Sequence, residues 1–259
     1  MKRWRFFITV LMIQLELTFS LRTSFFVKVG AIILKQGLFL VMWGFFFNKY
    51  NSINGWHFEE MLAMLGLTVF SIGVVELLFY GVRDLSAIVD NNQLDHYLTQ
   101  PKGVLINVAL SKGDISAISE IIYGLILLII SGYLISELLF LLLILPLGVL
   151  FIFSLYLYLG SISFYMKNSQ GFVHDLIQNA NTVATQPNCA YHGFFKIFTM
   201  TILPTTYLSF FPIEFLRGHM IYNLLYAYGG TLLFFFLAYT FFYQGLKRYE
   251  SGNSISQKY

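Results

Sequence analysis

Charged residues are scarce in this chain of 259 residues: Asp, Glu, Lys and Arg make up only 11% of it, against 57% hydrophobic residues. Soluble domains carry about 25% charged residues, so most of this protein's surface does not face water. The net charge of +3 gives no indication of nucleic-acid binding, because the placement of so few charges matters more than their sum. The composition is that of an integral membrane protein.

Cysteine is nearly absent as well. The single Cys189 excludes a disulfide within the chain and a cysteine-based metal site, and it is interpreted as small apolar filler. The sequence also has no G-x-x-x-x-G-K-[ST] P-loop, no H-E-x-x-H and no G-x-S-x-G, and its five histidines are scattered over different loops. We therefore expect no catalytic or metal site and no P-loop for ATP in this chain.

The sequence is instead rich in long apolar runs. Runs near the ~20 residues that cross a bilayer predict about six transmembrane helices, at residues 25–47, 60–80, 115–134, 138–164, 194–211 and 222–243. They should be helices because lipid cannot satisfy free backbone groups. The expected fold is an all-α integral membrane protein, with residues 1–259 forming a single domain.

The distribution of basic residues predicts the orientation. Lys and Arg gather before the first span, between the second and third, around the connection from the fourth to the fifth, and after the sixth, whereas the other side has only Lys49 and Arg217. By the positive-inside rule both termini are cytoplasmic, as are residues 81–114 and 165–193. Residues 1–23 predict an amphipathic helix at the interface; a cleaved signal peptide is the alternative.

Four charged residues fall within the expected spans: Lys28 and Lys35 in the first, Glu76 near the cytoplasmic end of the second, and Glu120 at the start of the third. A charge at the bilayer centre costs at least ~2.5–3.5 kcal/mol, so these side chains should face protein or a wet cavity. Depth counting predicts a Lys28–Glu76 pair, with snorkelling of Lys28 as the alternative. Lys35 lines a substrate path or meets a charge on another subunit.

The polar stretch "DNNQLDHYLTQP", residues 90–101, interrupts two apolar runs on the cytoplasmic side. Asn92 is expected to cap a short helix, and Asp95 places negative charge in its first turn. Leu94 and Leu98 lie one turn apart and predict an apolar ridge. The helix either rests on lipid headgroups or inserts into a cytosolic partner. The candidate partner-binding residues are Asp90, Asn92, Leu94, Asp95, Tyr97, Leu98 and Pro101, the last of which ends the helix.

Three segments, "SINGWHFEEMLAMLGLTVF", "AIVDNNQLDHYLTQP" and "ILPTTYLSFFPIEFL", resemble ABC-2 type permeases, specifically bacterial six-span permeases that lack a large extracellular domain. The resemblance covers nearly the whole chain in order. The matching residues are Gly55 and Trp56, then Leu94, Asp95, Leu98 and Pro101 of a G-x-L-D-x-x-L-x-x-P pattern, and finally Pro204 and Pro212. Asn92 replaces the glycine of that pattern, a mild departure because Asn tolerates a left-handed backbone.

This resemblance implies the permease half of an ATP-driven transporter, usually an exporter, in the bacterial cytoplasmic membrane. Two permease chains, identical or related, would sit on two cytosolic ATPase subunits that bind ATP and Mg²⁺. Residues 90–101 would be the coupling helix that fits a groove on the ATPase. The many aromatic residues, 28 Phe and 17 Tyr, favour a hydrophobic or amphipathic substrate.

Two further segments have open interpretations. In residues 165–193, Phe172, Leu176 and Val183 recur near helical spacing, which predicts an interfacial helix or a second ATPase contact. Pro204 and Pro212 predict a kinked fifth span with a short turn on the outer side, which forms an outer gate or is a simple kink.

Other functions remain as alternatives. An integral-membrane enzyme acting on lipids or polyprenols needs a cluster of polar residues at one membrane face. Asp90, Asp95 and His96 form such a cluster, but the adjoining Leu94 and Leu98 argue for docking instead. A membrane immunity or assembly protein is the third alternative.

Overall fold

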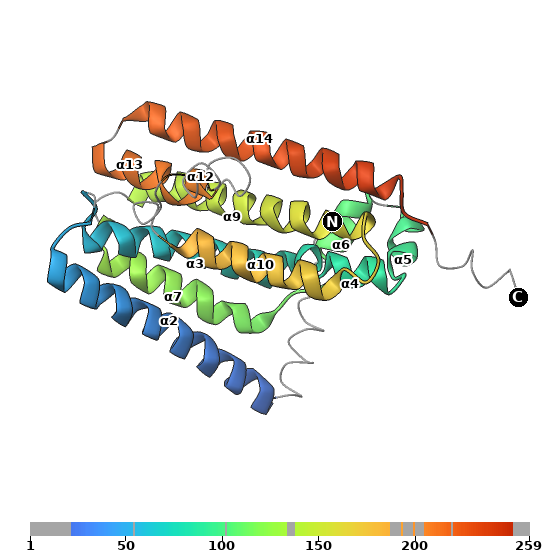
Figure 1. Cartoon of the computed structure of the whole chain (residues 1–259), viewed down its shortest axis with the longest axis horizontal. Coiled ribbons are helices and arrows are strands. Elements are labelled where there is room, and N and C mark those ends of the chain that lie inside the picture. Colours follow the sequence, from blue (N-terminus) through green and yellow to red (C-terminus); the bar gives the residue numbers. More distant parts are fainter. Residues whose placement is uncertain are drawn as a thin grey trace, which may run out of the picture.

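All regular structure in the described part of the chain is helical, as the sequence predicts (Figure 1). The computed structural model describes residues 22–133 except 54 and 102, then 138–186, 193, 199, 205–218 and 220–250. The expected interfacial helix at residues 1–23 lies almost wholly outside this part, and so does Cys189.

The apolar runs of the sequence form the long helices. They are α2 (Arg22–Tyr50), α3 (Phe58–Arg83), α7 (Ile118–Ile130, preceded by the 3-10 turn η1, Ile115–Ala117), α9 (Leu138–Gly160) and α14 (Ile221–Leu246). These five coincide with five of the expected spans, although the apolar helix at Ile115–Ile130 is shorter than the other four. Only the last part of the expected span at 194–211 is described, so a total of six spans stays a prediction.

The central helix of the bundle is α3, which packs against α7 on one side and α9 on another (Figure 1). Glycine permits the first of these contacts. A Cβ atom on Gly66 of α3 would lie 2.8 Å from the carbonyl oxygen of Gly124 on α7, so the two backbones touch. Small residues at a helix crossing are a common means of close packing in membranes.

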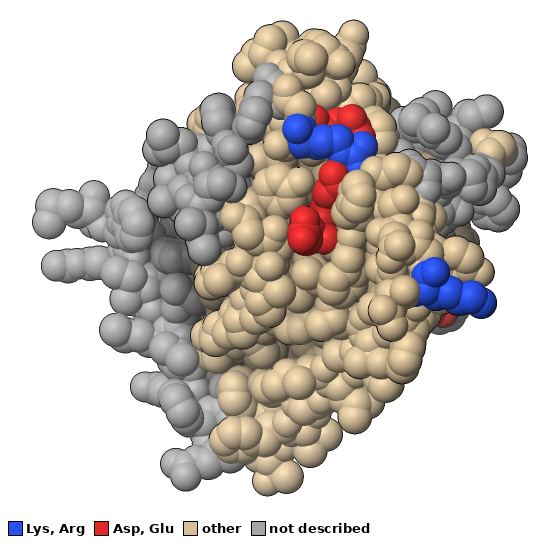
Figure 2. Space-filling model, turned by 90° about the vertical axis from the view of Figure 1, so that its left-hand side faces the viewer, with Lys and Arg blue, Asp and Glu red and all other residues tan. Residues whose placement is uncertain are grey.

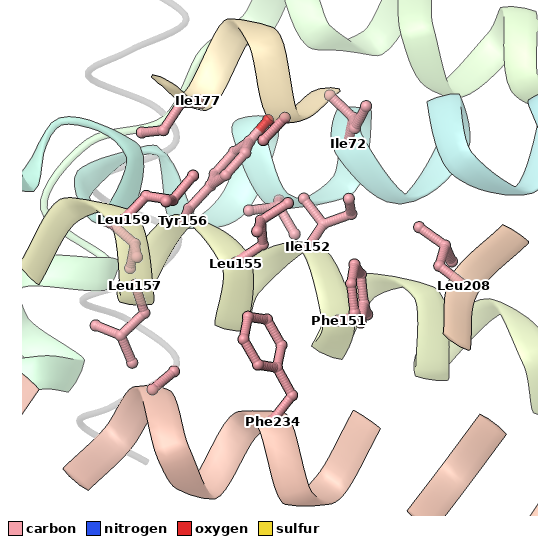
Figure 3. Packing of buried hydrophobic residues seen from close by; sticks show 14 of the residues in the cluster. Ile72, Phe151, Ile152, Leu155, Tyr156, Leu157, Leu159, Ile177, Leu208 and Phe234 are labelled. Carbon is pink, nitrogen blue, oxygen red and sulfur yellow. The ribbon is translucent and has the colours of Figure 1, made fainter. Parts of the chain in front are cut away.

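The main core lies between α3, α9, α10 (Gln170–Thr185) and α14. Figure 3 shows Phe151 of α9 next to Phe234 of α14, and Tyr156 reaching from α9 toward α3 and α10. The outward faces of α2 and α14 are apolar, with Ile33, Leu34 and Leu38 exposed on the first and Leu233 and Phe236 on the second. Such faces suit contact with lipid.

The connections gather at two ends of the bundle. One end, called the α5 end, contains α4 (Leu85–Asp90), α5 (Leu94–Leu98), α6 (Val104–Ala109), the 3-10 turn η2 (Ser161–Phe164) and the first turn of α10 (Figure 1). The α13 end contains the loop 51–57 and the short helices α12 (Thr206–Ser209) and α13 (Phe211–Gly218).

Candidate functional site

Asn92 ends helix α4, contrary to the expectation that it caps α5. Its φ of 57° is in the left-handed region. The Asn92 N–H donates to the Val89 carbonyl at 3.1 Å, and the Gln93 N–H donates to the Ile88 carbonyl at 2.9 Å. These are the two bonds of a Schellman motif, in which the left-handed residue follows the helix and is usually glycine. The residue before α5 is Gln93, which makes no side-chain cap.

The two leucines of α5 lie one turn apart but differ in burial, so they do not form the exposed ridge that was expected. Leu94 is completely buried and belongs to the main core, whereas the Leu98 side chain is 43% exposed. Tyr97 is partly buried against the same core. Leu94 therefore anchors the loop to the membrane helices, and Leu98, one turn later, is the exposed leucine of this helix.

The two carboxylates of the segment 90–101 face their own chain. Asp90 Oδ2 accepts hydrogen bonds from the Gln170 backbone N–H at 2.8 Å and from the Ser169 hydroxyl at 3.3 Å, and so stabilises the start of α10. Asp95 lies beside Tyr249, just after α14. Burial and the neighbouring Asp95 carboxylate raise the pKa of Tyr249 to about 12. Both contacts tie the loop to other helices.

What remains exposed and apolar on the loop is a small surface on two helices in contact, α5 and α6. It consists of Leu98 and of Ile106, which is 55% exposed, and is called the Leu98–Ile106 surface. Pro101 lies exposed in the connection between these helices. The sequence gives no sign of Ile106, because every residue of "VLI" at 104–106 is apolar and only the fold decides which of them points outward.

A second group, the buried polar network, consists of Glu76, Arg83, Tyr156 and Asn181. Glu76 and Arg83 form an ion pair on α3 with both side chains largely buried. The Tyr156 hydroxyl donates to Glu76 Oε1 at 3.2 Å, and Asn181 Nδ2 donates to Tyr156 Oη at 2.7 Å. Figure 3 shows the Tyr156 hydroxyl at the gap between α3 and α10. The network joins α3, α9 and α10.

Lys28 pairs with Asp114, and the predicted Lys28–Glu76 pair is wrong. Asp114 precedes η1 and also accepts from the Ser116 backbone N–H at 3.0 Å. Burial acts to raise the pKa of Asp114, but the hydrogen bonds from Lys28 and Ser116 outweigh it and hold the pKa below its ordinary value. The partner of Glu76 is Arg83, two turns further along the same helix.

Two other charges lie near this network. Glu120 on α7 is within the electrostatic reach of Glu76, Arg83 and Lys35, and its Oε2 atom is buried without a hydrogen-bond partner. Lys35 is exposed on α2 and forms no ion pair within the described part of the chain. The four intramembrane charges therefore lie within electrostatic reach of one another through Glu76 and Glu120, but no two of them form an ion pair in the described part of the chain.

At the α13 end, Arg217 fastens α13 to the start of α3. Its Nε donates to Glu60 Oε1 at 2.7 Å, its Nη2 to Glu60 Oε2 at 2.5 Å, and the same Nη2 to the Gly55 carbonyl at 2.8 Å. Glu60 also accepts from the His57 backbone N–H at 2.8 Å. The guanidinium lies over the Trp56 ring. Figure 2 shows this end, where basic and acidic side chains gather on a face that otherwise has few charges.

Pro212, expected to contribute to an outer gate, lies buried in the first turn of α13. Its missing N–H costs nothing there, because first-turn N–H groups have no partner within a helix. Pro212 therefore begins a short helix at the α13 end. Pro204 lies outside the described residues.

Replacing Arg217 with glutamine is expected to destabilise the protein by about 1–3 kcal/mol, because the buried Glu60 carboxylate loses two charge-assisted hydrogen bonds. Arg217→Lys should recover only part of this loss, since a lysine cannot make the two-pronged contact. Thermal unfolding of the purified protein in detergent measures both effects. Equal unfolding temperatures for Arg217→Gln and the native chain would show that the contact is not stabilising.

The helix α10 buries a different face from the one that the sequence indicates. Phe172 is exposed, whereas Val173, Ile177, Ala180 and Ala184 are buried. The helix packs along α3 and α9, and its last turn reaches the middle of α3, where the Thr68 hydroxyl contacts the Ala184 carbonyl at 3.5 Å. Pro187, which follows this helix in the sequence, lies outside the described residues.

Comparison with known proteins agrees with the membrane architecture. The family model described as "ABC-2 family transporter protein" matches residues 33–253, which is most of the chain and includes both the loop helices and the buried polar network. No curated protein and no solved structure matches the chain.

Proposed function

Because the chain belongs to the ABC-2 transporter family, we propose that it is the permease subunit of an ATP-driven exporter. In this proposal two permease chains, identical or related, form the membrane part, and two cytosolic ATPase subunits bind ATP and Mg²⁺ and supply the energy. The substrate is hydrophobic or amphipathic, in keeping with the abundance of aromatic residues. The protein is a multi-pass component of the bacterial cytoplasmic membrane.

The observation that carries this proposal is the Leu98–Ile106 surface. It lies on helices whose opposite sides are packed into the membrane core, through Leu94, Leu105 and Val108. A partner that pushes on this surface therefore moves the transmembrane helices directly. Exposed apolar side chains on a firmly held element are typical of an interaction site.

Charge placement supports a cytoplasmic position for the α5 end. Arg83, Lys112, Lys167, Lys247 and Arg248 lie at this end among the described residues. Lys49 and Arg217 lie at the α13 end. By the positive-inside rule the Leu98–Ile106 surface then faces the cytosol, where an ATPase subunit is found.

The alternative of a lipid-modifying enzyme receives less support from the geometry. Its best cluster was Asp90, Asp95 and His96, but the two carboxylates engage α10 and Tyr249. His96 is exposed, and its Nε2 contacts Nε2 of Gln100, just after the end of α5, at 3.1 Å. These groups do not converge on a place where a substrate could bind.

Purification of the tagged chain from its native membranes is expected to bring down an ATPase subunit with a P-loop, identified by mass spectrometry. Leu98→Asp, and separately Ile106→Asp, should weaken this complex by about thirtyfold or more, because a central apolar contact is worth about 2 kcal/mol or more. Binding of the separately purified subunits, measured by biolayer interferometry in detergent, gives this ratio. ATP hydrolysis stimulated by the permease should fall in parallel.

Asn91→Asp is the matched control, since it adds the same charge at an exposed polar position of the same loop. It should bind the ATPase like the native chain. Leu94→Asp is unsuitable as a test, because a charge at this buried position disturbs folding. Native affinity in both Leu98→Asp and Ile106→Asp, with the chain correctly inserted, would remove the docking assignment.

A further inference from the structure

The outward face of α10 is polar, unlike the outward faces of α2 and α14. Asp175, Asn179 and Thr182 are exposed, Gln178 is half-buried between them, and the positions fall three and four residues apart on one side of the helix. The opposite side supplies buried aliphatic residues to the core. The line formed by Gln178, Asn179 and Thr182 is called the α10 polar stripe.

The position of α10 along α3 places this stripe at membrane depth. The helix starts at the α5 end, where Asp90 binds the Gln170 N–H, and it ends beside Thr68. Thr68 is about 22 Å from the Arg83 end of α3 and about 15 Å from the Phe58 end, at 1.5 Å per residue. With a hydrocarbon core of about 30 Å, the second half of α10 lies well inside it, which differs from the cytoplasmic position expected for the whole of residues 165–193.

Lipid is a poor neighbour for the stripe. The Thr182 hydroxyl donates to the Gln178 backbone carbonyl at 3.0 Å, so the unfavourable contact is that of the Gln178 and Asn179 amides. In hydrocarbon these amides lose their hydrogen bonds to water, and no lipid group replaces these bonds. The helix cannot turn the stripe inward, because Asn181 on its buried side is held by the Tyr156 hydroxyl at 2.7 Å, which in turn binds Glu76. Asn181 thus fixes the rotation of α10 about its axis, and this rotation keeps the α10 polar stripe on the exposed face.

We propose that the α10 polar stripe is the wall of a water-filled path, along which a neutral hydrogen-bonding part of the substrate travels. At membrane depth the stripe offers amide and hydroxyl groups, which both donate and accept, and no charge. Asp175, nearer the α5 end, places a single carboxylate at the mouth of the path. The water-filled path is inferred from the polarity and depth of the stripe, whereas its use by a substrate rests on the proposed transport function.

Cysteine accessibility tests the path. In a Cys189→Ser background, Asn179→Cys and Thr182→Cys are compared with Leu233→Cys, an exposed position on the apolar face of α14. Membranes are treated with a charged methanethiosulfonate reagent, and the remaining thiols are counted by a maleimide gel shift after denaturation. The two stripe positions should react at least about tenfold faster than Leu233→Cys, because only the thiolate reacts and it forms only in contact with water.

Reaction rates of Asn179→Cys and Thr182→Cys as slow as that of Leu233→Cys would overturn the proposal, whether lipid or a second copy of the chain covers the stripe. Positively and negatively charged reagents should modify Thr182→Cys at rates within about threefold of each other, because the stripe is uncharged and nearby water screens distant charges. A strong preference for one charge would overturn the neutral character of the path.

The substrate part has a separate test. Thr182→Val and Asn179→Leu should reduce substrate-stimulated ATP hydrolysis while leaving ATPase binding at the Leu98–Ile106 surface unchanged. Native stimulation in both variants would overturn the role of the stripe in transport. Water access at Thr182→Cys in a chain that binds no ATPase would instead leave the path standing and refute the proposed function.

Discussion

Replacing Arg83 with alanine is expected to destabilise the protein by about 3–5 kcal/mol, because it leaves the buried Glu76 carboxylate without its partner. The Tyr156 hydroxyl provides one remaining hydrogen bond to Glu76, which cannot replace the guanidinium charge. The midpoint of unfolding in mixed micelles of increasing SDS content measures this loss. The loss of stability should exceed that caused by removing a more exposed ion pair, such as the one between Lys112 and Asp84.

Lys112→Ala is the matched control, since Lys112 forms an ion pair with Asp84 in which both side chains remain partly exposed. Its removal should cost no more than about 1 kcal/mol. The double variant Glu76→Leu with Arg83→Met should recover most of the stability lost in Arg83→Ala, because removing both buried charges also removes the cost of burying them. If Arg83→Ala unfolds at the same SDS content as the native chain, the ion pair between Glu76 and Arg83 does not stabilise the protein.

Gly81→Ala is expected to cost about 3 kcal/mol, near the upper end for overpacking, because the added methyl group meets the Val108 carbonyl of α6. A rigid backbone atom cannot move aside as the end of a long side chain can. The helix α6 must therefore shift away from α3, and the Leu98–Ile106 surface shifts with it. Thermal unfolding should show the loss of stability, and binding to the ATPase should weaken in the same variant.

Gly37→Ala on α2 provides the comparison, since nothing lies within 4 Å of a Cβ atom there. Alanine inside a helix is favoured over glycine by about 0.5–1 kcal/mol, so this variant should be as stable as the native chain or slightly more so. If Gly81→Ala unfolds at the same temperature as Gly37→Ala, α6 does not pack as closely on α3 as described.

The sequence was sufficient for the positions of the long helices, because the length of an apolar run that crosses a bilayer follows from bilayer thickness. The helices α2, α3, α9 and α14 lie where the apolar runs predict them. The short helix at 94–98 was also predicted, from Leu94, Leu98 and the proline that follows. These features depend on residues that are close together in the sequence, so the sequence pattern is enough to predict them.

The contacts between distant residues were harder to predict. Depth counting placed Lys28 level with Glu76 but gave no information on which side of α3 the carboxylate lies. Arg83 was counted as a cytoplasmic charge, although it reaches back to Glu76 from the end of the same helix. Likewise Leu94 and Leu98 lie one turn apart on the same helix, and only packing decides that Leu94 is buried and Leu98 exposed.

The buried face of the segment 170–185 was the hardest to predict from the sequence, because small residues occupy positions where large apolar residues are usual. Ala180 and Ala184 contribute little to an apolar pattern, and Asn181 contradicts it, yet all three are buried. The hydrogen bond between Asn181 and Tyr156 explains the exception. A polar residue whose hydrogen-bond partner is far away in the sequence cannot be distinguished from a surface residue by the sequence pattern.

The burial of Leu94 has a mechanical consequence. Leu94, Leu105 and Val108 belong to the same continuous hydrophobic cluster as Phe151 on α9 and Phe234 on α14. A loop that shares one close-packed interior with two membrane helices behaves as a rigid lever, because such interiors have low compressibility. A displacement of α5 at Leu98 is thus transmitted to α9 and α14, because all three helices contribute side chains to the packed cluster.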